Sequence, residues 1–260
     1  MLKQIYGGTV MYLRSPVSTV IWGYGVEFGG GMSVIAFASI KGGVGKTTAL
    51  ACLADHLCAA GQRVHVVDAD PNGHAYRLSE RMSQKLGGES RFWTTEQVDE
   101  GAIRQQIRAA RTLVGATGTV LVDLPGVAAK TTLFGLGLSD RIVVPIGPSG
   151  MDVTDALRTL DLIGEASDFI ERRLETSILL TRWPVQIETR IAREARERLA
   201  RLAPDIPQIS VPLMQRVQLS EMTMTYQAPR VAEPEGNAAA NVSAVCKAIM
   251  TALTEVGAAA

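Results

Sequence analysis

A glycine-rich octet near the start of the chain most constrains the fold that this sequence can adopt. Residues 41–48 read Lys-Gly-Gly-Val-Gly-Lys-Thr-Thr. They follow an apolar run at 34–39 that is typical of a buried strand, and they precede residues 49–60, where leucines recur at helical spacing. A glycine-rich turn between a buried strand and a helix is the arrangement of a phosphate-binding loop, so the octet predicts an α/β fold.

Each residue type in the octet suits phosphate. The glycines allow backbone conformations that bring several N–H groups toward one phosphate, and the N-terminus of the following helix adds partial positive charge. Lys46 is predicted to contact the β- and γ-phosphates of ATP, and Thr47 to bind Mg²⁺ through its hydroxyl. The predicted nucleotide-binding residues are Gly42, Gly43, Val44, Gly45, Lys46, Thr47 and Thr48.

A second lysine, Lys41, sets this loop apart from the ordinary pattern. That pattern begins with glycine, and this chain has Ile40 at the corresponding position. Burial of an unpaired ammonium group is costly, so Lys41 does not suit the protein core. It suits a place where phosphate charge is left unneutralised. The alternative is a glycine-rich loop that carries ordinary surface lysines.

The octet resembles the deviant P-loop of the ParA/MinD family of ATPases. The resemblance implies a doubly wound, mostly parallel sheet flanked by helices, with ATP and Mg²⁺ as cofactors. It also implies that Lys41 crosses to the nucleotide of the other subunit in an ATP-bound homodimer. The residues that the resemblance places in catalysis are Lys41, Lys46 and Asp70.

The second predicted strand, residues 63–71, delivers two aspartates at its carboxyl end. Strand alternation predicts that Asp68 and Asp70 face the same side, toward Mg²⁺ or an attacking water. The resemblance implies that Asp70 orients or activates the hydrolytic water and that Asp68 lies near the metal. Without the P-loop, a simple turn after the strand would be the favoured interpretation.

The third predicted strand, residues 119–123, ends in Asp123. An acid at this position can hold a Mg²⁺-bound water or the Thr47 hydroxyl, which is the Walker B role. Two more buried strands are predicted at 141–146 and 177–182. The predicted metal-binding set is Thr47, Asp68 and Asp123.

One predicted helix, residues 102–114, is a candidate for DNA contacts. Arg104, Arg108 and Arg111 share a face of this helix with no interleaved acid. Phosphate binding and an ordinary surface helix are equally supported for this stripe. The formal net charge of the chain is zero, so any nucleic-acid binding must come from such local patches.

Two further segments extend the resemblance. Residues 211–221 are similar to a partition-ATPase segment from a region linked to DNA binding, which makes Arg216 another candidate DNA contact. The octet, Asp68–Asp70 and residues 151–157 together are similar to the VirC-type ATPases, which assist transfer of single-stranded DNA between cells. The partition type and the DNA-transfer branch both remain open.

The chain is long and apolar enough, at 260 residues and 47% hydrophobic content, for one α/β domain at 32–260. Residues 1–31 are predicted to be an N-terminal extension that is disordered or lies upstream of the true start at Met32. Polar helices and no strand are expected between 71 and 118, with Trp93 in a loop. The three cysteines show no metal spacing and suit a reducing cytosol.

The resemblance implies a slow, partner-stimulated ATPase that binds DNA without sequence specificity and acts in plasmid partition or conjugative DNA transfer. It implies a cytoplasmic or nucleoid-associated protein whose partner is a centromere-binding adaptor or a relaxase-type protein. Two alternatives stay open. A MinD-like positioning ATPase is disfavoured because the tail shows no lysine-rich amphipathic helix and no stable membrane anchor is predicted. The other is an ATP-dependent metabolic synthetase on the same fold.

Overall fold

The centre of the protein is a parallel β-sheet. The computed structural model describes residues 2–6, 9–13, 33–85, 93–99, 101–126 and 130–255. Within them, seven strands form one sheet in the order β5-β4-β6-β3-β7-β8-β9, and every neighbouring pair is parallel. The strands are β3 (Ser33–Phe37), β4 (Val64–Asp68), β5 (Trp93–Gln97), β6 (Thr119–Asp123), β7 (Arg141–Ile146), β8 (Thr176–Trp183) and β9 (Leu213–Met214).

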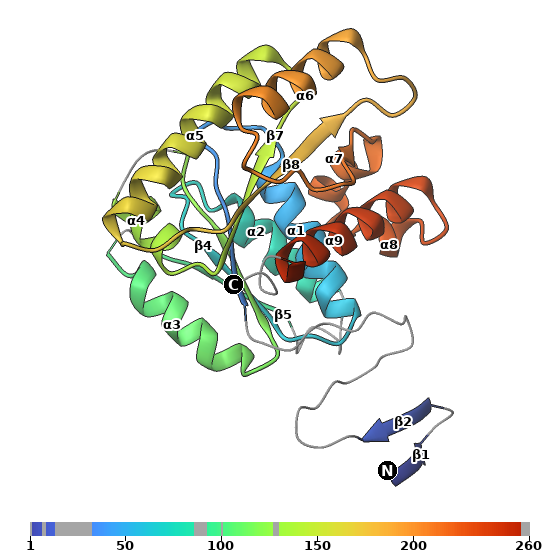
Figure 1. Ribbon diagram of the computed structural model, residues 1–260. Helices are drawn as coiled ribbons and strands as arrows, with labels where there is room; N and C mark the ends of the chain where they lie inside the picture. Colours follow the sequence, from blue (N-terminus) through green and yellow to red (C-terminus); the bar gives the residue numbers. More distant parts are fainter. Residues whose placement is uncertain are drawn as a thin grey trace.

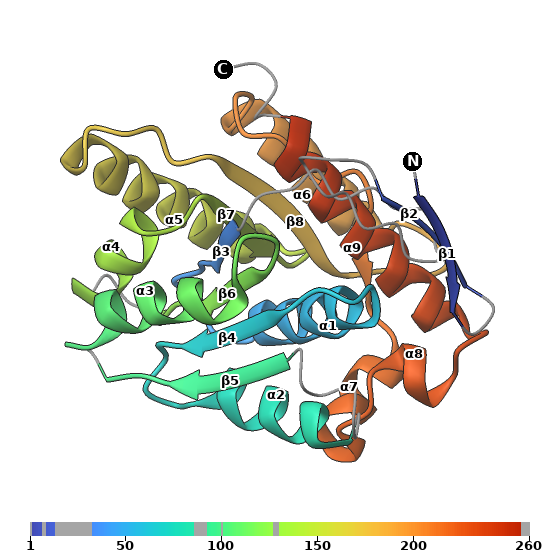
Figure 2. The same cartoon turned by 90° about the horizontal axis from the view of Figure 1, so that it is seen from below.

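Helices cover both faces of this sheet (Figures 1 and 2). One face carries α3 (Ile103–Val114), α4 (Lys130–Gly137), α5 (Gly150–Phe169) and α6 (Arg190–Leu202). The other carries α1 (Lys46–Ala59), α2 (His74–Lys85), α7 (Val217–Thr225), α8 (Pro229–Ala232) and α9 (Asn237–Glu255). Within the described ranges, no helix has both the length and the apolar character to cross a lipid bilayer.

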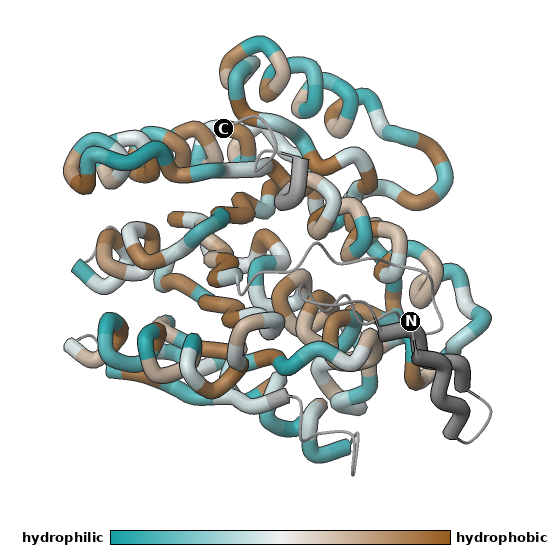
Figure 3. Tube along the Cα trace, turned by 60° about the horizontal axis from the view of Figure 1, so that its bottom comes forward, coloured by the Kyte–Doolittle hydropathy of each residue, from teal (hydrophilic) through white to brown (hydrophobic). Residues whose placement is uncertain are grey.

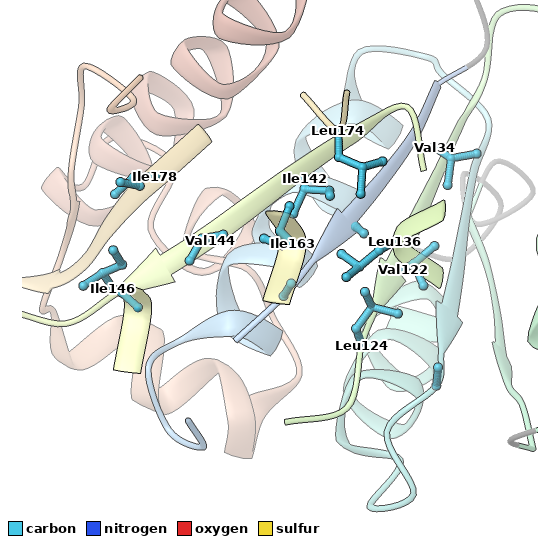
Figure 4. Close-up of a cluster of buried hydrophobic side chains, with 14 of the residues drawn as sticks. Val34, Val122, Leu124, Leu136, Ile142, Val144, Ile146, Ile163, Leu174 and Ile178 are labelled. Atoms are coloured by element: carbon cyan, nitrogen blue, oxygen red, sulfur yellow. The ribbon is translucent and has the colours of Figure 1, made fainter. Parts of the chain in front are cut away.

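Alternation along the strands divides the core into two layers. In β6, Val120 and Val122 pack under the helices of the first face, whereas Leu121 between them packs under those of the second. Figure 4 shows part of the first layer, with side chains from β3, β6 and β7 meeting those of α4 and α5. Figure 3 shows the hydrophobic segments concentrated on the strands in the interior. Because both faces are covered, the strands read as nearly continuous apolar runs in the sequence.

The fold class predicted from the sequence is confirmed, and the sheet is parallel throughout its described strands. One expectation was wrong: residues 71–118 contain a strand, β5, which pairs with β4 at the edge of the sheet. Its sequence is Trp-Thr-Thr-Glu-Gln, and Thr94 and Gln97 are exposed. An edge strand has only one neighbour and needs no continuous apolar run, so the pattern used to find the central strands missed it.

Part of the predicted N-terminal extension forms a hairpin that the sequence pattern did not predict. Strands β1 (Leu2–Tyr6) and β2 (Thr9–Leu13) pair antiparallel in a sheet of their own. The remainder of the predicted extension (residues 1, 7, 8 and 14–31) and Met32 lie outside the described residues. The proposal that translation starts at Met32 stays a prediction.

A buried ion pair joins the P-loop helix to the C-terminal part of the domain. Asp55 of α1 accepts hydrogen bonds from Arg230 of α8, at 3.0 Å from Nε and 2.9 Å from Nη2. The Asp55 side chain is only 3% exposed. A carboxylate this deeply buried depends on its partner, because an unpaired buried charge is costly.

We expect Arg230→Ala to lower the free energy of unfolding by about 2 kcal/mol, because it leaves the Asp55 carboxylate without its two-pronged donor. Urea denaturation monitored by circular dichroism measures the change. Arg193→Ala is the matched control, since Arg193 is exposed on α6 and should cost less than about 0.5 kcal/mol. Equal stabilities of the two variants would contradict the importance of this pair.

Candidate functional site

The P-loop lies at the carboxyl edge of the sheet, between the central strand β3 and α1. A cavity of about 830 Å³ opens at this edge. In open parallel sheets this is where ligands bind. Of the residues predicted from the sequence for the active site, the cavity is lined by Lys41, Gly42, Gly43, Gly45, Lys46, Thr47, Thr48 and Asp70.

The backbone of the loop explains two of its glycines. Gly43 and Gly45 have φ angles of 76° and 93°, in the left-handed region that side chains with a Cβ rarely adopt. Val44 between them turns its side chain into the protein and is 3% exposed, so only its backbone is placed to contribute to binding. Its carbonyl oxygen accepts a hydrogen bond of 2.5 Å from the Thr181 hydroxyl of β8.

The first turn of α1 is left open toward the cavity. Gly45 occupies the N-cap position and supplies no side chain to the free N–H groups of this turn. By contrast, α5 and α6 are capped by the side chains of Ser149 and Thr189. An uncapped helix N-terminus beneath a glycine-rich loop presents N–H groups and partial positive charge to an anion.

Lys46, Thr47 and Asp123 meet at the base of the cavity. The Thr47 hydroxyl donates to Asp123 Oδ2 at 2.8 Å, as predicted for a Walker B acid. Lys46 Nζ donates to the carbonyl oxygen of Leu124 and lies 3.4 Å from Asp123 Oδ1. Asp123 Oδ1 is buried and accepts no hydrogen bond within the described part of the chain.

Burial raises the pKa of Asp123 to about 6, and the nearby Lys46 ammonium opposes this shift. A buried carboxylate beside a hydroxyl offers oxygen ligands that suit a hard cation, and the neighbouring lysine suits a phosphate bound to that cation. The residues present therefore fit Mg²⁺ held by Thr47 and Asp123, with the remaining ligands from phosphate and water. The cation would neutralise charge on the β- and γ-phosphates.

The two aspartates after β4 have different surroundings. Asp68 is fully buried and accepts from the backbone N–H groups of Asp70 at 3.0 Å and Tyr76 at 2.7 Å. Burial raises its pKa, and these two hydrogen bonds oppose the shift. Asp70 lines the cavity. Strand β4 ends at Asp68, so alternation along the strand does not itself place Asp70, and the prediction that both face the same side stays a prediction.

Asp68 thus holds the turn that carries Asp70 and the first turn of α2. The sheet register pairs Asp68 with Asp123, and Asp68 does not line the cavity, so its place in the predicted metal-binding set stays a prediction. Asp70 Oδ1 accepts hydrogen bonds from the backbone N–H and from the side-chain amide of Asn72, each at 2.9 Å. This arrangement orients the Asp70 carboxylate at the wall of the cavity.

The ammonium group of Lys41 pairs with two acids of α5. Its Nζ is 2.7 Å from Asp152 Oδ1 and 3.8 Å from Asp155 Oδ2, both in the first turns of α5. Although burial acts to raise it, hydrogen bonds from Lys41 and Ser149 hold the pKa of Asp152 below its ordinary value. Lys41 is therefore held at the rim of the cavity as a charged side chain, about one third exposed at 32%.

The arginines predicted to contact DNA do not form one free stripe. Arg111 donates to Asp140 at 3.1 Å and to the Leu138 carbonyl oxygen at 3.1 Å. The guanidinium of Arg104 lies 5.2 Å from the ring centre of Phe134. Arg108 is exposed. Two of the three side chains on this face of α3 are thus already engaged within the protein.

Arg216 lies at the N-cap of α7 and lines the cavity. Its Nε is buried and has no hydrogen-bond partner among the described residues. The same cavity is lined by three further arginines that are not among the site residues predicted from the sequence: Arg77, Arg81 and Arg182. The first two stand one helical turn apart just after Asp70, and this spacing was the signal that could have found them.

Arg182 is unusual in its backbone. Its φ of 54° is in the left-handed region, which is uncommon for a residue other than glycine. Its Nη1 donates to the Gly43 carbonyl oxygen at 3.0 Å. The end of β8 therefore supports the P-loop twice, through Arg182 and through Thr181.

Comparison with known proteins identifies the family. A model of the VirC1 protein family matches residues 32–228, which is most of the chain. The chain belongs to the VirC1 family. This VirC1-family chain is 29% identical to protein ParA of Rhizobium radiobacter over 156 residues, which cover 58% of the chain and 64% of that protein. The match therefore spans slightly less than two thirds of that relative.

Protein virC1 of Rhizobium radiobacter matches a longer part of the VirC1-family chain. The identity is 27% over 191 residues, covering 74% of the chain and 80% of virC1. Together with ParA, this relative confirms the ParA/MinD-type family that the P-loop resemblance predicted, including its VirC1 branch.

Solved structures share the fold of the VirC1-family chain. McdA of Cyanothece without nucleotide superposes with a TM-score of 0.67 at 15% identity, covering 84% of this chain and 99% of that one. MinD of Aquifex aeolicus gives 0.62 at 18% identity, covering 84% and 97%. At these identities the likeness concerns the fold alone, which is that of ParA/MinD-type P-loop ATPases.

Proposed function

We propose that this chain is a Mg²⁺-ATP-dependent ATPase that dimerises on ATP binding, binds DNA, and acts in segregating DNA or in preparing it for transfer between cells. The observation that carries the proposal is the convergence of Lys46, Thr47 and Asp123 beneath an uncapped helix N-terminus. The lysine and the helix N-terminus suit a nucleoside triphosphate, and the threonine and aspartate oxygens suit its cation. Membership of the VirC1 family supports the wider role.

Each part of the cavity has a distinct task in this proposal. The P-loop N–H groups and Lys46 bind the triphosphate, and Thr47 with Asp123 would hold Mg²⁺, with Asp68 near the metal by family resemblance. Asp70 orients a water toward the γ-phosphate and accepts its proton. Hydrolysis is slow and acts as a timer, because loss of the γ-phosphate removes the contacts that favour the dimer.

The position of Lys41 supports the proposed dimer. Lys41 Nζ pairs with Asp152 and Asp155 of α5 at the cavity, whereas Lys46 Nζ lies beside Asp123. A lysine at the rim is placed to reach the triphosphate of a facing subunit. The homodimer would then form only while both subunits hold ATP.

The partners follow from the same family. We propose that the ATP-bound dimer binds DNA without sequence specificity and is nucleoid-associated in that state. Its hydrolysis is stimulated by a DNA-binding adaptor, such as a centromere-binding protein, or by a relaxase-type protein. Relatives named virC1 and ParA both match the chain. The partition and DNA-transfer roles would be distinguished by which partner stimulates ATP hydrolysis.

Asp70→Ala tests the hydrolytic role. We expect the rate of ATP hydrolysis to fall about a hundredfold, because a positioned general base contributes about that factor, while ATP affinity changes little. Single-turnover hydrolysis of radiolabelled ATP and binding of a fluorescent ATP analogue measure the two quantities. Asp99→Ala, an exposed acid outside the cavity, is the control. Turnover at the wild-type rate in Asp70→Ala would assign the base elsewhere.

A further inference from the structure

The cavity is lined by more positive than negative side chains. Lys41 and Lys46 stand at the P-loop, where a triphosphate would lie. Among the lining residues, Asp70 is the single carboxylate in the described part of the chain. The cavity is also lined by four arginines: Arg77 and Arg81 of α2, Arg216 at the N-cap of α7, and Arg182, which donates to the Gly43 carbonyl oxygen of the P-loop.

These four arginines have no carboxylate partner in the described part of the chain. Within the described residues, no carboxylate lies within ion-pair distance of these four guanidiniums. A base and its ribose are uncharged, so the nucleoside part of ATP would not supply the missing charge. Arginine stays protonated throughout the accessible pH range, so the positive charge is permanent. A second anion, separate from the triphosphate, would complement it.

Two of these arginines face outward at the lip of the cavity. Arg77 and Arg81 are exposed and stand one turn apart on α2, while Leu78 and Met82 turn into the core. The Arg81 guanidinium lies 5.2 Å from the ring centre of Tyr226, which follows α7. Figure 2 shows α2 and α7 side by side at this edge of the molecule. We call the surface formed by Arg77, Arg81 and Tyr226 the α2–α7 lip.

We propose that the α2–α7 lip binds the phosphate backbone of a nucleic acid, with Arg77 and Arg81 as the contacting side chains. The inference rests on the proposed DNA-binding function and places that function beside the nucleotide. Arginines one turn apart can contact phosphates of one strand, and guanidinium groups are well suited to phosphate oxygens. Tyr226 adds an aromatic face of the kind on which bases or guanidiniums stack.

The engagement of other arginines favours this surface over α3. Arg111 is already paired with Asp140. The ring contacts do not distinguish the two surfaces, because the guanidiniums of Arg104 and Arg81 each lie 5.2 Å from a ring centre, that of Phe134 or Tyr226. On the α2–α7 lip, by contrast, the Arg77 guanidinium donates only to a backbone oxygen, that of Asn72, among the described residues. Binding phosphate there would require no ion pair with a described residue to be broken.

The lip also adjoins the hydrolytic residue. The turn after Asp70 leads directly into α2, and Asp68 accepts from Tyr76 N in the first turn of this helix. A change at Asp70 when the γ-phosphate leaves would therefore reach Arg77 through a short, hydrogen-bonded segment. DNA affinity at this surface is accordingly expected to depend on the bound nucleotide.

The test compares two matched double variants of the full chain, each losing two exposed arginines one turn apart on a helix. Fluorescence anisotropy with a labelled DNA duplex, in the presence of a non-hydrolysable ATP analogue, gives the affinity from 50 to 200 mM salt. For Arg77→Ala with Arg81→Ala, we expect at least a tenfold loss of affinity. The log-log salt slope should become shallower by about 1.8, because each phosphate contact contributes about 0.9. The control, Arg104→Ala with Arg108→Ala, should leave both unchanged.

The outcomes separate this inference from the proposed function. If the wild-type protein binds no DNA, the proposed DNA-binding function fails. If the wild type binds DNA and the α2 variant keeps its affinity and slope, or the α3 variant loses them, only the position of the surface is overturned. An equal loss of ATP-analogue binding in the α2 variant would assign these arginines to the nucleotide. Arg77→Lys with Arg81→Lys keeps the charge and should retain most of the slope, which guards against a folding defect in the alanine variant.

Discussion

Lys46→Ala is expected to lose ATP binding, with affinity falling by at least about 150-fold. Lys46 Nζ donates to the Leu124 carbonyl oxygen and lies 3.4 Å from Asp123 Oδ1 at the base of the cavity. Truncating one partner of a desolvated charge pair costs about 3 kcal/mol, which corresponds to that loss of affinity. Isothermal titration with ATP and Mg²⁺ measures it directly.

Two controls make this result specific. Removal of Lys46 leaves the buried Asp123 carboxylate without its cation, so the folded state of the variant must be checked by thermal denaturation. Lys46→Gln shortens the side chain by one atom but keeps a hydrogen-bond donor, and it should lose affinity to a similar degree, because the charge is what binds phosphate. Lys85→Ala, at the exposed end of α2, should bind ATP normally. Tight binding by both Lys46 variants would refute the P-loop assignment.

Lys41→Ala is expected to separate ATP binding from dimerisation. The Lys41 side chain is held by Asp152 and Asp155 at the cavity rim, so its loss should change the ATP affinity of a single subunit by less than about threefold. The ATP-dependent dimer should weaken by at least about a hundredfold. Each of the two subunits would lose a charge contact to the other's triphosphate, and such contacts contribute about 2 kcal/mol or more when desolvated.

The dimer is best measured where hydrolysis does not remove it. Light scattering of Lys41→Ala in an Asp70→Ala background, with ATP and Mg²⁺, compares the variant with Asp70→Ala alone. Lys85→Ala in the same background controls for the loss of a surface charge. A normal ATP-dependent dimer formed by the Lys41 variant would show that this lysine does not act across subunits.

Local patterns were enough to predict the central sheet and the base of the site. The strands β3, β4, β6, β7 and β8 are apolar runs because both of their faces are covered, so composition alone reveals them. The carboxyl ends of parallel strands meet at one edge, so Thr47 and Asp123 could be placed together although they are far apart in the sequence. The polar edge strand β5 lacks such a run and was not found.

Orientation at the ends of elements was harder to predict. Strand alternation makes Asp68 and Asp70 look equivalent, but Asp68 is buried and accepts from two backbone N–H groups, whereas Asp70 lines the cavity. The arginine stripe on α3 looked free because its acidic partner, Asp140, lies on another segment. In both cases the deciding contact is made by a residue whose position depends on the folded chain.

The amino-acid sequence alone determined the phosphate-binding loop, the parallel sheet and the order of the acids, because glycine conformations, apolar periodicity and strand ends are local properties. Only the tertiary structure decided where the charged side chains rest: Lys41 on two acids of α5, and Arg77 and Arg81 on a shared lip with α7. Charges act through space over a few ångströms, and chain folding, not sequence spacing, sets which of them become neighbours.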